Sequence, residues 1–281
     1  YDSAGIALYD GEALKVCKTK GKVVDLEKKV QESITSNGSI GIGHTRWATH
    51  GGVTEANAHP HVSDDRIAVV HNGIIENYQE LKDDLEALGY VFTSQTDTEV
   101  VAHLVKDALK STPSLLEAVQ QVVPQLKGAY ALGIVHTDHP DELITVREGS
   151  PLVIGVGIGE NFISSDQLAL LPITNRFIYL EEGDIARLTR NSIEVFGAGQ
   201  RVERPIKELD AAVSNASKGE YKHYMLKEIY EQPLAVRNTL EGRLNDDRVA
   251  IDAFGDSAQQ IFKDVKHVQI IACGTSYHSG M

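Results

Sequence analysis

The chain has 281 residues, 42% of them hydrophobic, which is enough to bury the core of one large or two ordinary domains. Its 27 basic and 40 acidic side chains give a formal net charge of −13, and an acidic surface that repels phosphate argues against a nucleic-acid partner. The two cysteines form no ligand or redox pattern and suit a reducing cytoplasm, and no apolar run is long enough to span a bilayer.

The first half of the chain predicts short strands separated by helices. Residues 5–9 and 14–18 alternate enough to pair as a hairpin around a two-residue turn at Asp10-Gly11. Two further strands, "SIGIGHTR" and "RIAVVHNG", each end in polar residues. Helices are predicted over 25–36, over 76–88 with Gly89 as the stop, after Asp97, and from the N-cap Ser114 to about Gln125.

From Ala129 to Phe196 the sequence changes to short β-rich runs broken by Gly, Pro, Asn and Asp. This pattern predicts a mostly antiparallel sheet, interrupted by one short helix at 166–170. Two sheets with helices collected in blocks indicate an α+β layered sandwich. A charged linker follows, and the remaining predicted elements are a helix over 221–242 broken or kinked by Pro233, a helix over 256–263 and a strand over 267–272.

Three polar motifs follow predicted strands and together suit an amino-acid ligand. In "GIGHTRWATHGG", residues 41–52, Arg46 offers a planar fork of donors that fits a carboxylate. In "VVHNGIIEN", the Asn72 amide and the Gly73 backbone N–H could form an oxyanion hole. In "SQTDTE", Asp97 could hold an ammonium group. A nucleophile is missing, because Cys17 lies in a strand pattern with no base near it in sequence.

Each of these residues also has an ordinary structural interpretation. Arg46 could be a solvated surface charge, Asn72-Gly73 a turn, and Asp97 a helix N-cap. Trp47 could belong to the core. The five histidines at 44, 50, 59, 61 and 71 lack the spacing of a closed zinc site, so we predict no metal and no cofactor, and we expect His44 and His71 to form hydrogen bonds within the core.

The motifs occur in an order that resembles a known family. The resemblance to the glutaminase domain of the glutamine–fructose-6-phosphate aminotransferase family rests on "YDSAGIA", "GIGHTRWATHG", "NAHPH", "VVHNGIIENY", "TDTEV", "KGAYAL", "GSPLVIG", "SSDQLALL" and "YLEEGDIA". Two later motifs, "HYMLKEIYEQP" and "IACGTSYHSG", resemble the link to the family's sugar-isomerase domain and its opening. The earlier motifs are shared by all amidotransferases with an N-terminal nucleophile. The last two motifs narrow the resemblance to the glutamine–fructose-6-phosphate aminotransferase family.

The resemblance implies a four-layer αββα sandwich of the N-terminal-nucleophile hydrolase type, followed by the first elements of an α/β sugar-isomerase domain. The implied boundaries are 1–205 for the glutaminase domain, 206–220 for the linker and 221–281 for the incomplete isomerase domain. The implied reaction hydrolyses glutamine and passes the ammonia to fructose 6-phosphate, which gives glucosamine 6-phosphate. Family habit suggests a cytoplasmic homodimer.

The resemblance also assigns roles to single residues. Arg46 would bind the α-carboxylate of glutamine, Asp97 its α-amino group, and Thr49 and His50 would line the pocket. Asn72 and Gly73 would form the oxyanion hole, and Trp47 would gate the passage of ammonia. The sugar-phosphate loop would begin with Cys273, Gly274, Thr275 and Ser276.

The family nucleophile is an N-terminal cysteine, which would lie upstream of Tyr1, so we expect the chain to be a fragment cut at both ends and inactive as it stands. Two alternatives remain open. One is another amidotransferase, such as amidophosphoribosyltransferase or asparagine synthetase, which lack a "CGTSYHSG" strand and turn after the glutaminase domain. The other is a non-catalytic module that binds glutamine.

Overall fold

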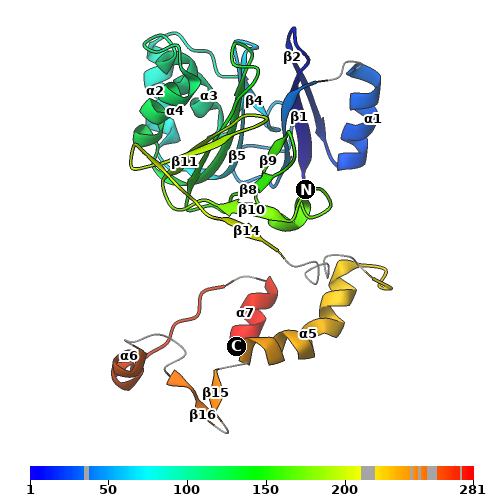
Figure 1. Cartoon of the computed structure of the whole chain (residues 1–281), viewed down its shortest axis with the longest axis vertical. Coiled ribbons are helices and arrows are strands. Elements are labelled where there is room, and N and C mark those ends of the chain that lie inside the picture. Colours follow the sequence, from blue (N-terminus) through cyan, green and yellow to red (C-terminus); the bar gives the residue numbers. More distant parts are fainter. Residues whose placement is uncertain (35–37, 210–218, 241–242, 246–247, 252–257, 273) are drawn as a thin grey trace. The chain divides into compact units, whose positions relative to one another are not determined.

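The structure, a computed structural model, describes residues 1–34, 38–209, 219–240, 243–245, 248–251, 258–272 and 274–281. The chain divides into two units, Tyr1–Ser214 and Asn215–Met281 (Figure 1). No helix among the described residues is long and apolar enough to cross a membrane.

The first unit is built around a seven-stranded sheet in which every neighbouring pair of strands is antiparallel. Its order is β13-β12-β11-β7-β6-β5-β4. The strands are β4 (His61–Ser63), β5 (Ile67–Ile75), β6 (Gly128–His136), β7 (Leu143–Glu148), β11 (Asp184–Leu188), β12 (Ile193–Gly197) and β13 (Gln200–Val202). The antiparallel strands predicted from Ala129 to Phe196 are confirmed, but they divide between two sheets: only β6, β7, β11 and β12 belong to this one, and β4 and β5 extend it.

Two smaller sheets pack on one face of this sheet. The first has the order β2-β1-β3, with β1 (Ser3–Tyr9), β2 (Leu14–Lys20) and β3 (Ile40–Arg46). The second has the order β14-β10-β8-β9, with β8 (Val153–Val156), β9 (Asn161–Ser164), β10 (Arg176–Tyr179) and β14 (Ile206–Glu208). A short 3-10 helix, η2 (Gln167–Ala169), lies where the sequence predicts one. Apolar residues of both small sheets form one buried cluster with the seven-stranded sheet.

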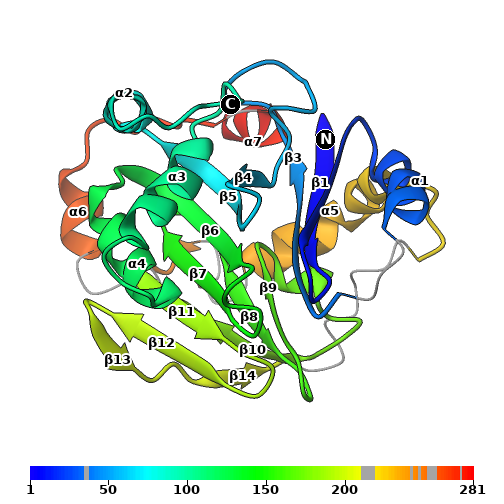
Figure 2. The same cartoon turned by 90° about the horizontal axis from the view of Figure 1, so that it is seen from above.

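Helices cover the two outer faces of the first unit, on opposite sides of the sheets (Figure 1). Helix α1 (Val23–Ser33) packs on β1 and β2 through a small cluster of Ala4, Cys17 and Leu26. On the other side lie α2 (Tyr78–Ala87), α3 (Glu99–Ala108) and α4 (Leu115–Val122), followed by the 3-10 helix η1 (Val123–Gln125) (Figure 2). The layers run helix, sheet, sheet, helix, which confirms the predicted four-layer sandwich for this unit.

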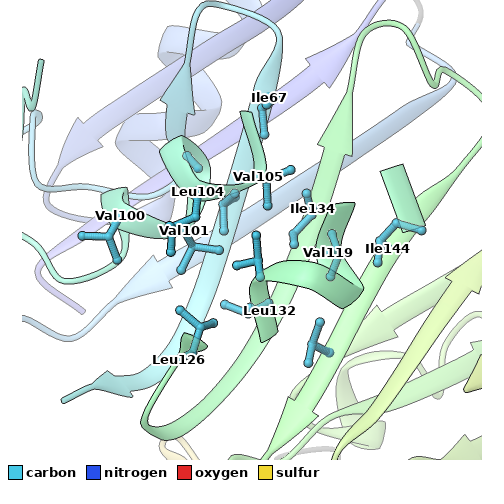
Figure 3. Close-up of a cluster of buried hydrophobic side chains, with 14 of the residues drawn as sticks. Ile67, Val100, Val101, Leu104, Val105, Val119, Leu126, Leu132, Ile134 and Ile144 are labelled. Atoms are coloured by element: carbon cyan, nitrogen blue, oxygen red, sulfur yellow. The ribbon is translucent and has the colours of Figure 1, made fainter. Parts of the chain in front are cut away.

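The alternation of side chains along β5 explains how one strand serves two cores. Ile67 and Val69 join the cluster beneath α2, α3 and α4, which Figure 3 shows in close-up. Ala68 and Val70, one residue along, join the cluster between the sheets. Because successive side chains of a strand point to opposite faces, a continuous apolar run is what a strand buried on both faces needs.

Local chemistry differs from the sequence predictions at two places in the first unit. The hairpin β1–β2 has a four-residue connection, because Asp10 Oδ1 accepts the backbone N–H groups of Glu12 and Ala13 and so closes a longer turn. Asp97 is not the N-cap of α3. Thr98 holds that position, and Asp97 instead accepts the backbone N–H of Ile75. Ser114 caps α4 as predicted by accepting the backbone N–H of Glu117.

The second unit contains short elements. They are α5 (Tyr224–Leu240), β15 (Leu244–Asn245), β16 (Arg248–Val249), α6 (Ala258–Asp264) and α7 (Gly274–Gly280). Pro233 lies inside α5, which continues through it. The strand predicted over 267–272 is wrong: these residues form no strand, and Val268, Ile270 and Ile271 are exposed. A strand is stabilised by pairing with a neighbour, and no such pairing occurs among the described residues of this segment.

The division between the units, after residue 214, falls inside the predicted linker of 206–220. The start of that linker is wrong, because residues 206–208 form β14 and pair with β10. The exposed edge of β10 offers unpaired backbone groups, and the chain leaving the first unit satisfies them. Residues 210–218 of the predicted linker lie outside the described residues.

Candidate functional site

Most of the predicted glutamine-site residues line one cavity of about 390 Å³ in the first unit. The cavity lies where the end of β3, the end of β5 and the loop before α3 meet. Its lining includes the predicted residues Arg46, Trp47, Thr49, Asn72, Gly73 and Asp97. It also includes Tyr1, His44, Thr45, His59, His71, Ile74, Thr96 and Thr98. Residues far apart in sequence thus converge on one space.

The Arg46 guanidinium is buried and holds the loop that follows β3. Its Nη1 donates to the Gly52 carbonyl at 3.2 Å, and its Nη2 donates to the His50 carbonyl. Burial lowers the pKa of Arg46, while the carboxylates of Asp2 and Asp97 oppose that shift. An arginine side chain has five N–H donors, so these two bonds leave donors for a ligand.

His50 does not line the cavity, although the resemblance implies that it would. Its ring lies edge-on to Tyr78, with ring centroids 5.4 Å apart. Its contribution to the site is the backbone carbonyl that receives Arg46.

Gly73 occupies a backbone conformation that other residues rarely adopt. Its φ is +126°, and a Cβ there would lie 2.0 Å from the Ala129 carbonyl oxygen on the neighbouring strand. Asn72, one residue earlier, is held through its side chain: His44 Nε2 and Asn72 Oδ1 are 2.7 Å apart. With its oxygen engaged by His44, the Asn72 amide keeps its NH₂ group for the cavity.

The loop before α3 is fixed by buried carboxylates. The Glu99 carboxylate accepts four hydrogen bonds, from the backbone N–H and hydroxyl groups of Thr93 and Ser94. These bonds and that of His103 lower the pKa of Glu99 against the opposing effect of burial. Asp97 Oδ2 accepts the Ile75 backbone N–H at 2.8 Å and so joins this loop to the end of β5.

Four neighbouring histidines lie at or near the inner wall of the cavity. His59 and His71 are buried and line it, His44 is half-buried and lines it, and His61 is buried but does not line it. The ring centroids of His44 and His59 are 4.3 Å apart, and those of His59 and His61 are 4.8 Å apart. Two threonine hydroxyls of the loop before α3 bind these rings: Thr96 binds His61, and Thr98 binds both His59 and His71. The prediction that His44 and His71 form internal hydrogen bonds is confirmed.

Burial lowers the pKa of all four of these histidines, so the rings are neutral at pH 7. No group of three or more His, Cys, Asp or Glu side chains in the described part of the chain is arranged to hold a metal ion. The sequence reasoning missed the threonines at 96 and 98. Their alternation with Asp97 in "TDT" before a helix was the available signal.

Trp47 lies at the rim of the cavity and is 75% exposed. The alternative interpretation of Trp47, the single tryptophan, as a core residue is therefore wrong. A larger cavity of about 570 Å³ lies elsewhere, near β12 and β13. Its lining lacks histidine and holds none of the predicted site residues, so size does not identify the site here.

In the second unit, Gly274 and Ser276 begin α7, and Gly274 has a φ of +58°. Thr275 lies between them on the same helix. Cys273, which precedes them, lies outside the described residues. A helix begins where the sequence predicts that the chain can enter one, although no strand leads into it.

Comparison with known proteins identifies relatives along the whole chain. The glutamine amidotransferase domain family matches residues 44–172, which include every cavity residue from His44 to Thr98. The glutamine–fructose-6-phosphate aminotransferase of Acinetobacter baylyi is 69% identical over 281 residues, which are 100% of this chain and 45% of that protein. The enzyme of the same name from Idiomarina loihiensis is 58% identical over 283 residues, covering 100% of this chain and 46% of its own length.

A solved structure is also similar. The glutamine phosphoribosylpyrophosphate amidotransferase of B. subtilis, in complex with ADP and GMP, superposes with a TM-score of 0.59 and 27% identity. The superposition covers 70% of this chain and 43% of that one. The chain spans less than half the length of the curated relatives that it matches.

Proposed function

Because this chain carries a glutamine amidotransferase domain and is homologous along its whole length to glutamine–fructose-6-phosphate aminotransferases, we propose that its histidine-walled cavity binds glutamine for hydrolysis of the side-chain amide. One observation carries the proposal. A guanidinium, a carboxylate and the Asn72-Gly73 pair line a single cavity, although they come from three separate segments. These groups match the carboxylate, the ammonium and the reacting amide of one amino acid.

The two charged groups orient the substrate. The donors of Arg46 that its loop does not use bind the α-carboxylate, since a guanidinium pairs with a carboxylate through parallel N–H bonds. Asp97 binds the α-ammonium group, because the Ile75 bond uses only part of the acceptor capacity of its carboxylate. Thr49 lines the same cavity and adds a hydroxyl. His50 supports this arrangement through its carbonyl rather than its ring.

The end of β5 stabilises the transition state. The nucleophile implied by the family resemblance is an N-terminal cysteine of the whole protein, whose thiolate forms a C–S bond to the amide carbon and places negative charge on the carbonyl oxygen. Breaking of the C–N bond then releases ammonia, and water hydrolyses the thioester to glutamate. Donors aimed at the carbonyl oxygen lower the barrier to attack. The Asn72 NH₂ group and the Gly73 backbone N–H are these donors. Cys17 is not the nucleophile in this proposal, because it is buried against α1 together with Ala4 and Leu26.

In the whole protein, ammonia passes to fructose 6-phosphate and gives glucosamine 6-phosphate. The relatives at 69% and 58% identity bear the name of that reaction, whereas the phosphoribosylpyrophosphate enzyme is 27% identical. Trp47, exposed at the cavity rim, gates the ammonia. Gly274, Thr275 and Ser276 contribute to the sugar-phosphate site, because backbone amides at the start of a helix attract phosphate. The protein acts in the cytoplasm as a homodimer, with a sugar-isomerase domain that begins near residue 221.

Calorimetric titration of the chain with L-glutamine tests the binding site. Arg46→Lys is expected to weaken binding about tenfold or more, because lysine cannot form two parallel bonds to a carboxylate. Arg66→Lys is the matched control, since Arg66 pairs with Asp138 on the surface and does not line the cavity. Equal affinity in the Arg46→Lys and Arg66→Lys variants would refute the role of Arg46.

Kinetics of the full-length protein test the other two roles. Asn72→Ala is expected to lower kcat by on the order of a hundredfold with a small effect on KM, as for the loss of an oxyanion donor. A change in KM alone would remove Asn72 from the oxyanion hole. Ser276→Ala is expected to raise KM for fructose 6-phosphate without changing glutamine hydrolysis, and an unchanged KM would remove Ser276 from the phosphate site.

A further inference from the structure

One hydroxyl group contacts two of the buried histidines. Thr98 Oγ1 lies 2.9 Å from His59 Nε2 and 2.9 Å from His71 Nδ1. Thr98 is fully buried and is the N-cap residue of α3, but its side chain makes no capping hydrogen bond. The hydroxyl is therefore committed to the two imidazoles, and none of the roles proposed above uses it.

The two contacts limit which of the three groups can donate a hydrogen bond and which can accept one. Burial keeps both rings neutral, so each carries a single N–H. A hydroxyl has one hydrogen to donate. The two rings therefore cannot both accept from Thr98, so at least one imidazole donates to its oxygen. If both donated, the buried Thr98 hydrogen would have no acceptor among the hydrogen bonds of the described residues, which is costly, so the other ring accepts it.

The surrounding charges decide which ring donates. His71 Nδ1 lies 4.0 Å from Asp97 Oδ2, and a carboxylate at that distance favours a proton on the facing nitrogen. The charged or ionisable groups that act on His59 are His44, His61, His71 and Arg46, and none of them is a carboxylate that would favour a proton on its Nε2. His71 Nδ1–H therefore donates to Thr98, and Thr98 donates to His59 Nε2.

No other bond in the described structure fixes these two rings. The remaining ring nitrogens, His59 Nδ1 and His71 Nε2, are buried and have no hydrogen-bond partner among the described residues. A rotation of either ring would break the Thr98 contact and leave another buried polar atom unpaired, which is costly. Among the hydrogen bonds of the described residues, only those to Thr98 orient these two rings.

We propose that Thr98 is a positioning residue whose hydroxyl accepts from His71, donates to His59 and thereby holds the two halves of the cavity together. His71 directly precedes Asn72 and Gly73 on β5, and Thr98 directly follows Asp97. The Thr98–His71 bond and the Asp97–Ile75 bond tie the same two segments on either side of the cavity. Loss of the hydroxyl shifts the Asp97 carboxylate relative to the oxyanion donors.

The proton arrangement can be measured without any ligand. In the unmodified chain at neutral pH, ¹⁵N NMR of labelled histidine is expected to show both His59 and His71 with the proton on Nδ1, with assignments from His59→Gln and His71→Gln variants. The Nε2–H form at His71 would overturn the proposal. Because this measurement uses no glutamine, it stands even if the proposed function fails.

Binding tests the positioning effect, and this arm rests on the proposed function. Thr98→Val keeps the side-chain shape and removes the hydroxyl, and it is expected to weaken binding of L-glutamine about tenfold. Thr98→Ser should restore near-normal affinity. Thr145→Val is the matched control, because Thr145 is also fully buried and donates to the Leu132 carbonyl at 2.6 Å without lining the cavity.

The outcomes distinguish the positioning role of Thr98 from the proposed glutamine-binding function. Unchanged affinity in Thr98→Val would overturn the positioning role, as would Thr98→Ser weakening binding as much as Thr98→Val does. Failure of the unmodified chain to bind glutamine would instead count against the proposed function, and the histidine spectra would then decide the Thr98 proposal alone. If Thr98→Val does not fold, the spectra of the unmodified chain and the affinity of Thr98→Ser remain decisive.

Discussion

The first unit of the chain buries apolar side chains, whereas the second unit leaves most of its described ones exposed. Of the hydrophobic side chains that the structure describes as buried, all lie in the first unit except Ala258. In the second unit, helix α5 carries apolar residues at helical spacing that remain exposed, among them Ile229, Tyr230 and Leu234. An amphipathic pattern is thus present in both units, but among the described residues a second layer covers it only in the first.

The same contrast holds for histidine. The first unit buries His59, His61 and His71 in hydrogen-bonded contact with threonines. In the second unit, His223, His267 and His278 are exposed. The comparison shows that layered packing, rather than residue type, creates the environment in which polar groups become fixed. Four predictions probe this difference, from the largest expected effect to the smallest.

Truncation of a core leucine should separate the two units most clearly. Leu132, in β6, is 1% exposed, and Leu132→Ala should lower the free energy of unfolding by about 2–5 kcal/mol through lost burial and the cavity that remains. Leu234, in α5, is 52% exposed, and Leu234→Ala should change that free energy by no more than about 0.5 kcal/mol. Guanidinium unfolding followed by far-UV circular dichroism measures both. Similar losses would mean that the second unit also packs a core.

Replacement of glycine tests how tightly each unit encloses its backbone. Gly73→Ala should cost the first unit about 1–3 kcal/mol, because its φ of +126° strains an alanine and the added Cβ meets the Ala129 carbonyl. Gly52→Ala, with nothing within 4 Å of the new Cβ, is the control beside the same cavity. In the second unit, Gly274→Ala also meets open space and should leave the first unit's unfolding unchanged. A stable Gly73→Ala variant would contradict the enclosed geometry of β5.

Acid should destabilise the first unit through its histidines. Burial lowers the pKa of His71 to about 4 and that of His61 to about 3, from 6.5. Between the lowered pKa of each histidine and the ordinary value of 6.5, that histidine binds a proton in the unfolded chain but not in the folded unit. Stability is therefore complete above pH 6.5 and falls as the pH drops, by about 1.4 kcal/mol per pH unit for each such histidine.

The pH effect is measured by denaturant unfolding from neutral pH down to about pH 5, above the range in which carboxylates protonate. His61→Gln should reduce the slope of stability against pH, whereas His267→Gln in the second unit should not. An unchanged slope in His61→Gln would show that this histidine does not stay neutral in the folded unit.

Substitutions near helix ends should change stability least, and the change should have opposite signs in the two units. Ser114 caps α4, and Ser114→Ala should lower the stability of the first unit by about 1 kcal/mol. Thr239 in α5 is exposed and bonds the Ala235 carbonyl one turn earlier, so Thr239→Ala should strengthen that helix by a few tenths of a kcal/mol. Thermal unfolding detects the first change, and hydrogen exchange of α5 amides detects the second. Loss of α5 protection in Thr239→Ala would contradict the expectation.

Much of the first unit could be predicted from the sequence, because its signals are local. Alternating runs predicted the strands, and Ser114 marked the start of α4. Asn72 and Gly73, which the sequence places after an apolar strand, lie inside β5 near its end. The prediction of a strand over 267–272 was wrong because it also rested on a local signal alone. An apolar run of that length suits a strand only when a neighbour pairs with it, and local sequence contains no information about that neighbour.

By itself the sequence identified candidate residues for the site and roughly which element holds each one. Only the tertiary structure decided what those residues do to one another. It left His50 out of the cavity lining, made Thr98 rather than Asp97 the N-cap, and joined Thr98 to His71 and His59 across 27 and 39 positions of sequence. Periodicity and capping act over a few residues, whereas a hydrogen bond between two layers depends on how the sheets and helices stack.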